Sequence, residues 1–256
     1  MRSFVAFLKK ELIGHIRSGR LLITLAVFVA LGIMNPAVAK LTPWLLETFW
    51  DSMGMGMGEA PVIVPTALDS FAQFYKNIPM GLIVIVLLEG GILTGEYRSG
   101  TMIMSLTRGL ARYKVVTAKA LMLLSLYTLG YWLSYLVTYA YNCFYFDNGI
   151  AAHPHLSALY YYVFGIFVLA LLMLASTLAN ETSLALLITG GGVLLSYLLS
   201  LIPPIKKYLP THLTGGTSIV CGTAEPREYV AALLITLALI AASLIGALLL
   251  FRKKQL

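Results

Sequence analysis

The stretch Leu82-Ile-Val-Ile-Val-Leu-Leu88 decides the fold, because it is apolar on every face that a helix or a strand could present. A strand of a membrane barrel alternates apolar and polar residues over about 10 positions, and this stretch does not alternate. A helix that is apolar on all sides is typical of the interior of a bilayer. The stretch lies within residues 78–95, an apolar segment close to the length of about 20 residues that spans the hydrocarbon layer.

Five further apolar segments of similar length occur along the chain. They are residues 21–39, 115–140, 156–179, 184–202 and 230–251. Of the 256 residues, 59% are hydrophobic and only 11% are charged, whereas roughly a quarter are charged in an average soluble domain. The sequence therefore predicts an all-α membrane protein, with residues 1–256 forming one transmembrane domain of six transmembrane helices.

The Lys and Arg residues indicate the orientation of these spans. Six spans place both termini on one side, and if that side is cytoplasmic, 13 of the 18 Lys and Arg residues face the cytosol. We therefore expect a multi-pass protein of the cell (cytoplasmic) membrane with both termini cytoplasmic. This topology accounts for the net charge of +7. We therefore expect membrane lipid as a partner and no nucleic acid.

Residues that could bind metal or form a disulfide lie in segments expected to be outside the cell. Cys143 and Cys221 are both in such segments, where a disulfide is chemically permitted. The repeat Met53-Gly-Met-Gly-Met-Gly58 offers thioethers that could bind Cu(I), although flexible apolar filler explains it better. His153 and His155 have no further ligand cluster beside them, so no metal site is predicted.

Two segments on the expected cytoplasmic side are amphipathic. Residues 1–20 place apolar residues at helical spacing and Lys and Arg on the other side, which predicts a helix in the inner headgroup layer. That helix is either an anchor or a lever that couples a cytosolic partner to the first span. The loop 96–114 has an apolar patch at Met102-Ile-Met104 and Leu106 between glycines, which favours a compact docking knob.

This loop resembles the first cytoplasmic loop of ABC-2-type permeases, the membrane subunits of one class of ATP-binding-cassette exporters. The residues that carry the resemblance are Glu96-x-Arg98-x-Gly100-Thr101, Leu106, Arg112 and Lys119. Residues 9–12 and 17–20 are similar to the N-terminal elbow helix of that family, and the span count and chain length extend the resemblance to the whole chain. One departure is Arg108-Gly-Leu-Ala-Arg112, where the family usually has a Pro–x–Ser–Arg-like turn.

The resemblance implies a coupling helix after the second span, seated in a cleft of a separate ATP-binding subunit. The coupling residues that it implies are Glu96, Arg98, Ser99, Gly100, Thr101 and Arg112. An exposed ion pair at a helix end is the alternative for Glu96 and Arg98. The chain has no Gly-x-x-x-x-Gly-Lys-Ser/Thr phosphate loop, so it is expected not to be an enzyme and to carry no cofactor. ATP and Mg would bind the partner, two copies of which would pair with a permease homodimer.

Three features inside the spans are candidates for function. Tyr127, Tyr131, Tyr135 and Tyr139 recur every four residues and could line a substrate pathway or pack between spans. Glu89 is an intramembrane charge near the expected cytoplasmic end, and it is either functional or reaches a Lys or Arg at the interface. Gly190, Gly191 and Gly192 form a small-residue run, which the resemblance places at a dimer contact, with flexible kinking as the alternative.

These features predict the permease subunit of an exporter for a hydrophobic or amphipathic substrate, either an antimicrobial or toxin peptide or a drug. Lipid or glycan export stays open. The alternative is an ion- or proton-coupled secondary transporter that uses Glu89 and Glu181, although buried charges are scarce for that class. A membrane-embedded enzyme is disfavoured, because neither a His-Glu-x-x-His motif nor a nucleophile elbow occurs.

Overall fold

The computed structural model describes residues 2–52, 64–102, 107 and 111–254. In this part of the chain, six helices are long and apolar enough to cross a membrane. They are α2 (Arg20–Ser52), α3 (Ala67–Glu89), α6 (Arg112–Tyr145), α7 (Pro154–Leu178), α8 (Thr182–Leu199) and α11 (Val230–Lys253). No strand occurs among the described residues. The chain is therefore an all-α membrane protein of multi-pass type, which confirms the fold class that the apolar segments predict.

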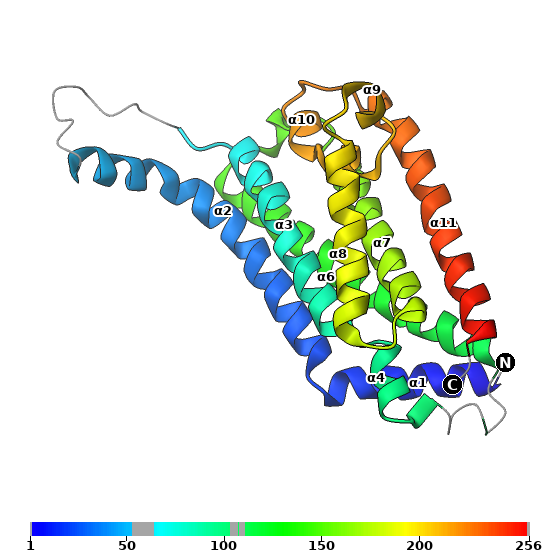
Figure 1. Cartoon of the computed structure of the whole chain (residues 1–256). Helices are drawn as coiled ribbons and strands as arrows, with labels where there is room; N and C mark the ends of the chain where they lie inside the picture. Colours follow the sequence, from blue (N-terminus) through cyan, green and yellow to red (C-terminus); the bar gives the residue numbers. More distant parts are fainter. Residues whose placement is uncertain (1, 53–63, 103–106, 108–110, 255–256) are drawn as a thin grey trace.

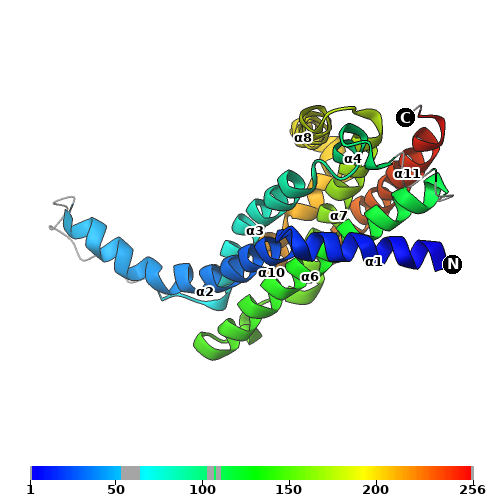
Figure 2. The ribbon, with the colours of Figure 1, turned by 90° about the horizontal axis from the view of Figure 1, so that it is seen from below.

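Short helices gather at the two ends of the bundle (Figure 1). Both chain termini lie at one end, named the terminal end below, where α1 (Arg2–Arg17) crosses the bundle and α4 (Thr94–Arg98) lies beside it. Figure 2 shows α1 from below, running next to α6. The opposite, distal end carries η1 (Asn148–Ile150), α9 (Pro203–Lys206), η2 (Pro210–Thr214), α10 (Gly216–Val220) and η3 (Pro226–Tyr229).

The first two spans differ from the expected bounds. The helix of the first span continues through Pro36 and Pro43 to Ser52, and α3 begins at Ala67, so helices replace much of the loop expected at 40–77. A capping box between Thr66 and Asp69 starts α3 before its apolar part. At the other end, α3 stops at Glu89, and the pair Gly90-Gly91 leads into α4, because glycines are poor helix formers.

Close packing joins α2, α3 and α6. The Phe28 ring is fully buried, and a methyl group added to Gly81 of α3 or Gly130 of α6 would lie only 2.8 Å from it. A chain of polar groups crosses the same interface: the Asn77 amide donates to Asn35 Oδ1 at 2.9 Å, and the Asn35 amide donates to Thr138 Oγ1 at 3.0 Å. Small residues and satisfied polar groups are what hold helices together in lipid, where apolar contact alone has little advantage.

The helix α7 occupies the middle of the bundle, where it packs on α3, α6, α8 and α11. Its distal start is tied to α3 and to the short helix α10, since the Ser157 hydroxyl lies 2.7 Å from Tyr75 Oη and 2.8 Å from the Gly216 carbonyl oxygen. These contacts leave α8 and α11 at the periphery, with large apolar side chains facing outward. Such faces are ordinary where the surroundings are lipid.

Candidate functional site

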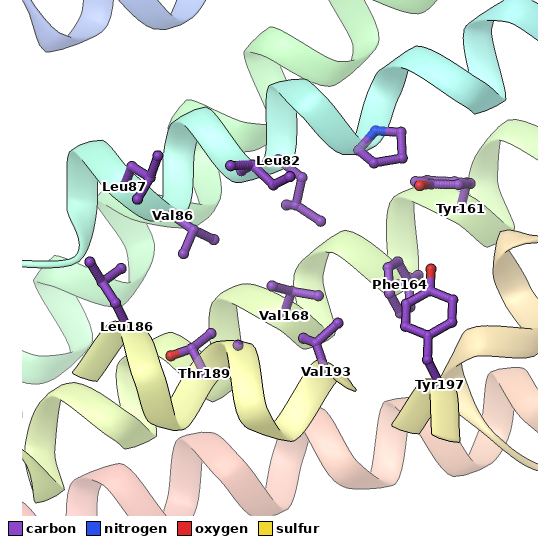
Figure 3. A pocket seen from close by; sticks show the side chains of 13 residues that line it. Leu82, Val86, Leu87, Tyr161, Phe164, Val168, Leu186, Thr189, Val193 and Tyr197 are labelled. Carbon is purple, nitrogen blue, oxygen red and sulfur yellow. The ribbon is translucent and has the colours of Figure 1, made fainter. Parts of the chain in front are cut away.

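An apolar pocket of about 310 Å³ lies between α3, α7 and α8. Figure 3 shows side chains from the three helices converging on it. The labelled residues are Leu82, Val86 and Leu87 of α3, Tyr161, Phe164 and Val168 of α7, and Leu186, Thr189, Val193 and Tyr197 of α8. The stretch that decides the fold therefore also supplies one wall of the pocket.

The chemistry of the pocket suits an apolar group. Its few polar atoms are hydroxyls of Thr189, Tyr161 and Tyr197, and the Thr189 hydroxyl already donates to the Ala185 carbonyl at 2.8 Å. The volume is at the lower end of small-molecule sites, which run from roughly 300 to 1,000 Å³. An alkyl chain or an aromatic ring would fit, and a charged group would find no partner among these lining residues.

A second site, named the charged cluster, lies at the terminal end. It joins α1, α2, α3, α4 and α6 and consists of Lys10, Glu11, His15, Arg20, Glu89, Glu96 and Lys119. These residues border a cavity of about 400 Å³, together with backbone from Gly14, Gly91 and Gly95. Three acids and three permanent cations balance, so the protonation of His15 sets the net charge.

Lys119 is the centre of the charged cluster. Its ammonium group lies 2.9 Å from Glu11 Oε2 and 3.2 Å from Glu96 Oε1, and its side chain is only 4% exposed. Lys10 reaches the same Glu96 oxygen at 3.4 Å from a more exposed position. One buried lysine thus connects α1, α4 and α6, and such a cation needs both acids to offset its loss of water.

Glu89 is fully buried at the end of α3 and binds the other half of the charged cluster. Its Oε2 lies 3.2 Å from His15 Nε2 and 3.4 Å from Arg20 Nη1, whereas its Oε1 has no hydrogen-bond partner among the described residues. The Nδ1 of His15 faces the Glu11 carbonyl oxygen at 2.9 Å. Because both ring nitrogens face oxygen acceptors, the arrangement favours the charged imidazolium.

We expect His15 to make stability depend on pH. Its hydrogen bond to Glu89 raises the pKa of His15 above the ordinary 6.5, although burial opposes this. A raised folded-state pKa stabilises the protein below the unfolded value and loses that stabilisation as pH rises through the folded value. The melting temperature in detergent should therefore fall as pH rises above about 6.5. In His15→Gln that slope should weaken; an unchanged slope would contradict the role of His15.

The tyrosine stripe of α6 is packed between helices in this structure. Tyr127, Tyr131 and Tyr135 are almost completely buried, and Tyr139 is half-buried. Tyr131 donates to the Ala158 carbonyl at 2.7 Å, and Tyr135 Oη lies 2.8 Å from His155 Nδ1. None of the four lines the apolar pocket. A pathway along the stripe would require α6 and α7 to separate, so that role stays a prediction.

The expected coupling residues have different surroundings in the structure. Glu96 belongs to the charged cluster, whereas Arg98 and Ser99 are exposed at the end of α4, and no ion pair joins Arg98 to another described residue. Gly100 ends this turn with φ +68°, a conformation that favours glycine. Thr101 follows, with the Ser99 hydroxyl 2.9 Å from its own.

Two other parts of the expected coupling region, Arg112 and the apolar knob, lie outside α4 in the chain. The Arg112 guanidinium donates to the carbonyl oxygens of Phe251 and Arg252 at 3.4 and 3.3 Å, so it caps the end of α11. Of the apolar knob, Met102 is fully buried. Its other members, Ile103, Met104 and Leu106, lie outside the described residues.

Gly190 and Gly191 are exposed on α8, and Gly190 also borders the apolar pocket. A methyl group added to either glycine would meet nothing within 4 Å, whereas on Gly192 it would lie 3.5 Å from Leu171. The run therefore leaves a shallow open surface on α8, as a close helix contact requires, although no second chain is present to test it.

Sequence reasoning missed the roles of Glu11, His15 and Lys119. The available signals were a lysine seven residues inside α6 and two ionisable residues four apart on an amphipathic helix. The spacing of Phe7, Glu11 and His15 marks the face of α1 that is buried, while Leu12 and Ile16 are exposed.

No family model, curated protein or solved structure matches this chain. The geometry of the two sites and the resemblance of the loop therefore carry the functional argument.

Proposed function

We propose that the chain is the permease subunit of an ATP-driven exporter that moves a hydrophobic or amphipathic substrate out of the cell. The observation that carries this proposal is the apolar pocket between α3, α7 and α8. Its apolar lining suits such a substrate, and it lies within the spans. An antimicrobial or toxin peptide or a drug would present alkyl or aromatic groups to it. Hydrolysis of ATP is assigned to a separate subunit, two copies of which bind a permease homodimer.

The contacts of α4 support a route from that subunit to the pocket. α4 follows α3 directly, and its Thr94 hydroxyl lies 3.0 Å from the Thr182 hydroxyl at the start of α8. Lys119 ties Glu96 of α4 to α1 and α6. A displacement of α4 would therefore act on α3 and α8, two of the three walls of the pocket. The proposal places α1, α4 and both termini in the cytoplasm of a cell membrane.

Arg98→Ala should reduce the ATPase activity of the complex several-fold without destabilising the permease. Arg98 is exposed, so its loss should change stability by no more than about 0.5 kcal/mol. Substitution of Glu96 or Gly100 would disturb the charged cluster or the φ +68° turn as well, so these variants test coupling less cleanly. Arg227→Ala, exposed at the distal end, is the control. Equal ATPase activity in the two variants would count against coupling through α4.

Val193→Trp should lower transport by about tenfold, because the larger ring occupies the pocket and removes about 1.4 kcal/mol of substrate binding. The control is Leu234→Trp, because this side chain is 62% exposed on α11 and belongs neither to the pocket nor to the glycine run of α8. Resistance of cells to a panel of cationic amphipathic peptides and hydrophobic drugs would measure transport. An equal loss of transport in both variants would contradict a role of the pocket in substrate binding.

The purified protein provides the first test of the class. Extraction in mild detergent should retain an ATP-binding subunit, and its repeated absence would overturn the exporter proposal. Proton-coupled secondary transport is the second candidate, favoured by the buried Glu89–His15 pair beside a cavity. Transport that persists without ATP and stops when the proton gradient is collapsed would establish that alternative.

A further inference from the structure

The distal part of α2 is longer than a span requires. From Arg20, a rise of about 1.5 Å per residue covers the roughly 30 Å hydrocarbon layer near Lys40. The helix nevertheless continues to Ser52 and contains Pro43. Figure 1 shows this last part leaving the bundle sideways at the distal end, instead of continuing along the bundle axis.

The side chains of this part form an exposed apolar stripe. Leu41, Trp44 and Leu45 follow the spacing of one helical face, and they are 52%, 60% and 40% exposed. Glu47 lies on a neighbouring face and is also exposed. The hydroxyls of Thr42 and Thr48 donate to carbonyls one turn back, at 2.7 and 2.9 Å, which reduces their need for water.

Aromatic residues of α6 mark the same level of the bundle. Tyr141, Phe144 and Tyr145 at the end of α6 are exposed. The Lys40 ammonium lies 4.0 Å from the centre of the Tyr145 ring, and Lys40, Leu41, Tyr141 and Tyr145 border a shallow pocket of about 190 Å³. Tyrosine, tryptophan and lysine together are typical of the boundary between headgroups and acyl chains.

We infer that residues 41–49 of α2 form an interfacial helix that inserts its apolar stripe into the headgroup–acyl boundary at the distal face of the membrane. The span arithmetic places the segment at that depth, its sideways course keeps it there, and the aromatic end of α6 continues the same layer. Glu47 then faces the headgroups or water.

A lipid surface explains the stripe better than a second copy of the chain. Even fully buried, a tryptophan and two leucines remove only a few hundred Å² from solvent, whereas a stable protein interface buries about 800 Å² on each partner. Lipid needs no such area, because the remainder of the protein already holds the segment at the membrane.

Depth-dependent fluorescence quenching tests the inference. The full chain with Trp50→Phe and Trp132→Phe, which leaves Trp44 alone, is reconstituted into phosphatidylcholine vesicles that carry bromines near the headgroup or near the bilayer centre. Shallow bromines should quench Trp44 about twofold more than deep ones. The matched control adds Trp44→Phe and Glu47→Trp, and this tryptophan should be quenched weakly by both lipids. Equal quenching at positions 44 and 47 would overturn the inference.

Cysteine labelling gives a second measurement if the tryptophan variants fail to fold. On a background with Cys143→Ser and Cys221→Ser, Trp44→Cys should react several-fold more slowly with a water-soluble maleimide in vesicles than Glu47→Cys does. Efficient Trp44→Cys cross-linking between chains at high lipid-to-protein ratio would instead identify a second copy as the occupant and overturn the lipid assignment.

Discussion

Lys119→Met is expected to destabilise the protein by about 3–5 kcal/mol, the cost typical of removing one partner from a buried ion pair. The Lys119 side chain is 4% exposed, and its loss would leave the buried Glu11 carboxylate beside an apolar side chain, with only the more exposed Lys10 still near it at 3.6 Å. By the usual relation for chains of this size, the melting temperature in detergent should drop by roughly 10 °C. Thermal denaturation followed by size-exclusion chromatography would measure the change.

Two further variants separate burial of charge from loss of packing. Lys9→Met removes a lysine from the exposed side of α1 and should change stability by no more than about 0.5 kcal/mol. Glu11→Gln combined with Lys119→Met should recover part of the lost stability, because the double variant no longer buries a carboxylate that has lost its buried lysine and keeps only the more exposed Lys10, 3.6 Å away. If Lys119→Met melts at the temperature of Lys9→Met, the charged cluster does not hold α1 to the bundle.

Gly165→Ala is expected to cost at least about 3 kcal/mol, at the upper end for overpacking in a core. The added methyl group would lie 2.0 Å from the Tyr127 hydroxyl oxygen. Tyr127 cannot move aside cheaply, because its ring is 1% exposed and stacks on Tyr162 with centroids 5.4 Å apart. Yield of folded protein and melting temperature in detergent would measure the effect.

The control for Gly165 is Gly191→Ala, in which the same methyl group enters open space. This variant should keep its melting temperature as an isolated chain, while weaker self-association would support Gly191 as a dimer contact. Tyr127→Leu combined with Gly165→Ala should lose less stability than the two single losses together, because the clash is shared. Additive losses would contradict this account of α6–α7 packing.

The spans were predictable from local sequence, and their ends were not. All six apolar segments correspond to helices, because each one is long enough to span lipid whatever its neighbours are. The helix of the first span, α2, continues through Pro43 to Ser52, beyond the apolar segment that predicted it. The second span ends at Glu89 because a glycine pair follows, a local signal that the apolar run through Leu93 obscured.

The candidate sites were predictable only in part. Glu89 and Glu96 were recognised as notable acids, and an interfacial partner for Glu89 was one of the expected alternatives. Its partners proved to be His15 and Arg20, which lie 74 and 69 residues away. The apolar pocket had no sequence signal, because an apolar residue such as Leu82 or Val193 is equally suited to face lipid, a neighbouring helix or a pocket.

By itself the sequence determined that six segments leave water, because the free energy of transfer adds up residue by residue along a helix and requires no particular partner. It also determined that α1 is amphipathic. Only the tertiary structure decided that α1 turns Glu11 and His15 toward the bundle and leaves Leu12 and Ile16 exposed. Lipid accepts apolar side chains anywhere on the surface, whereas a buried charge is stable only where folding brings an opposite charge within a few Å.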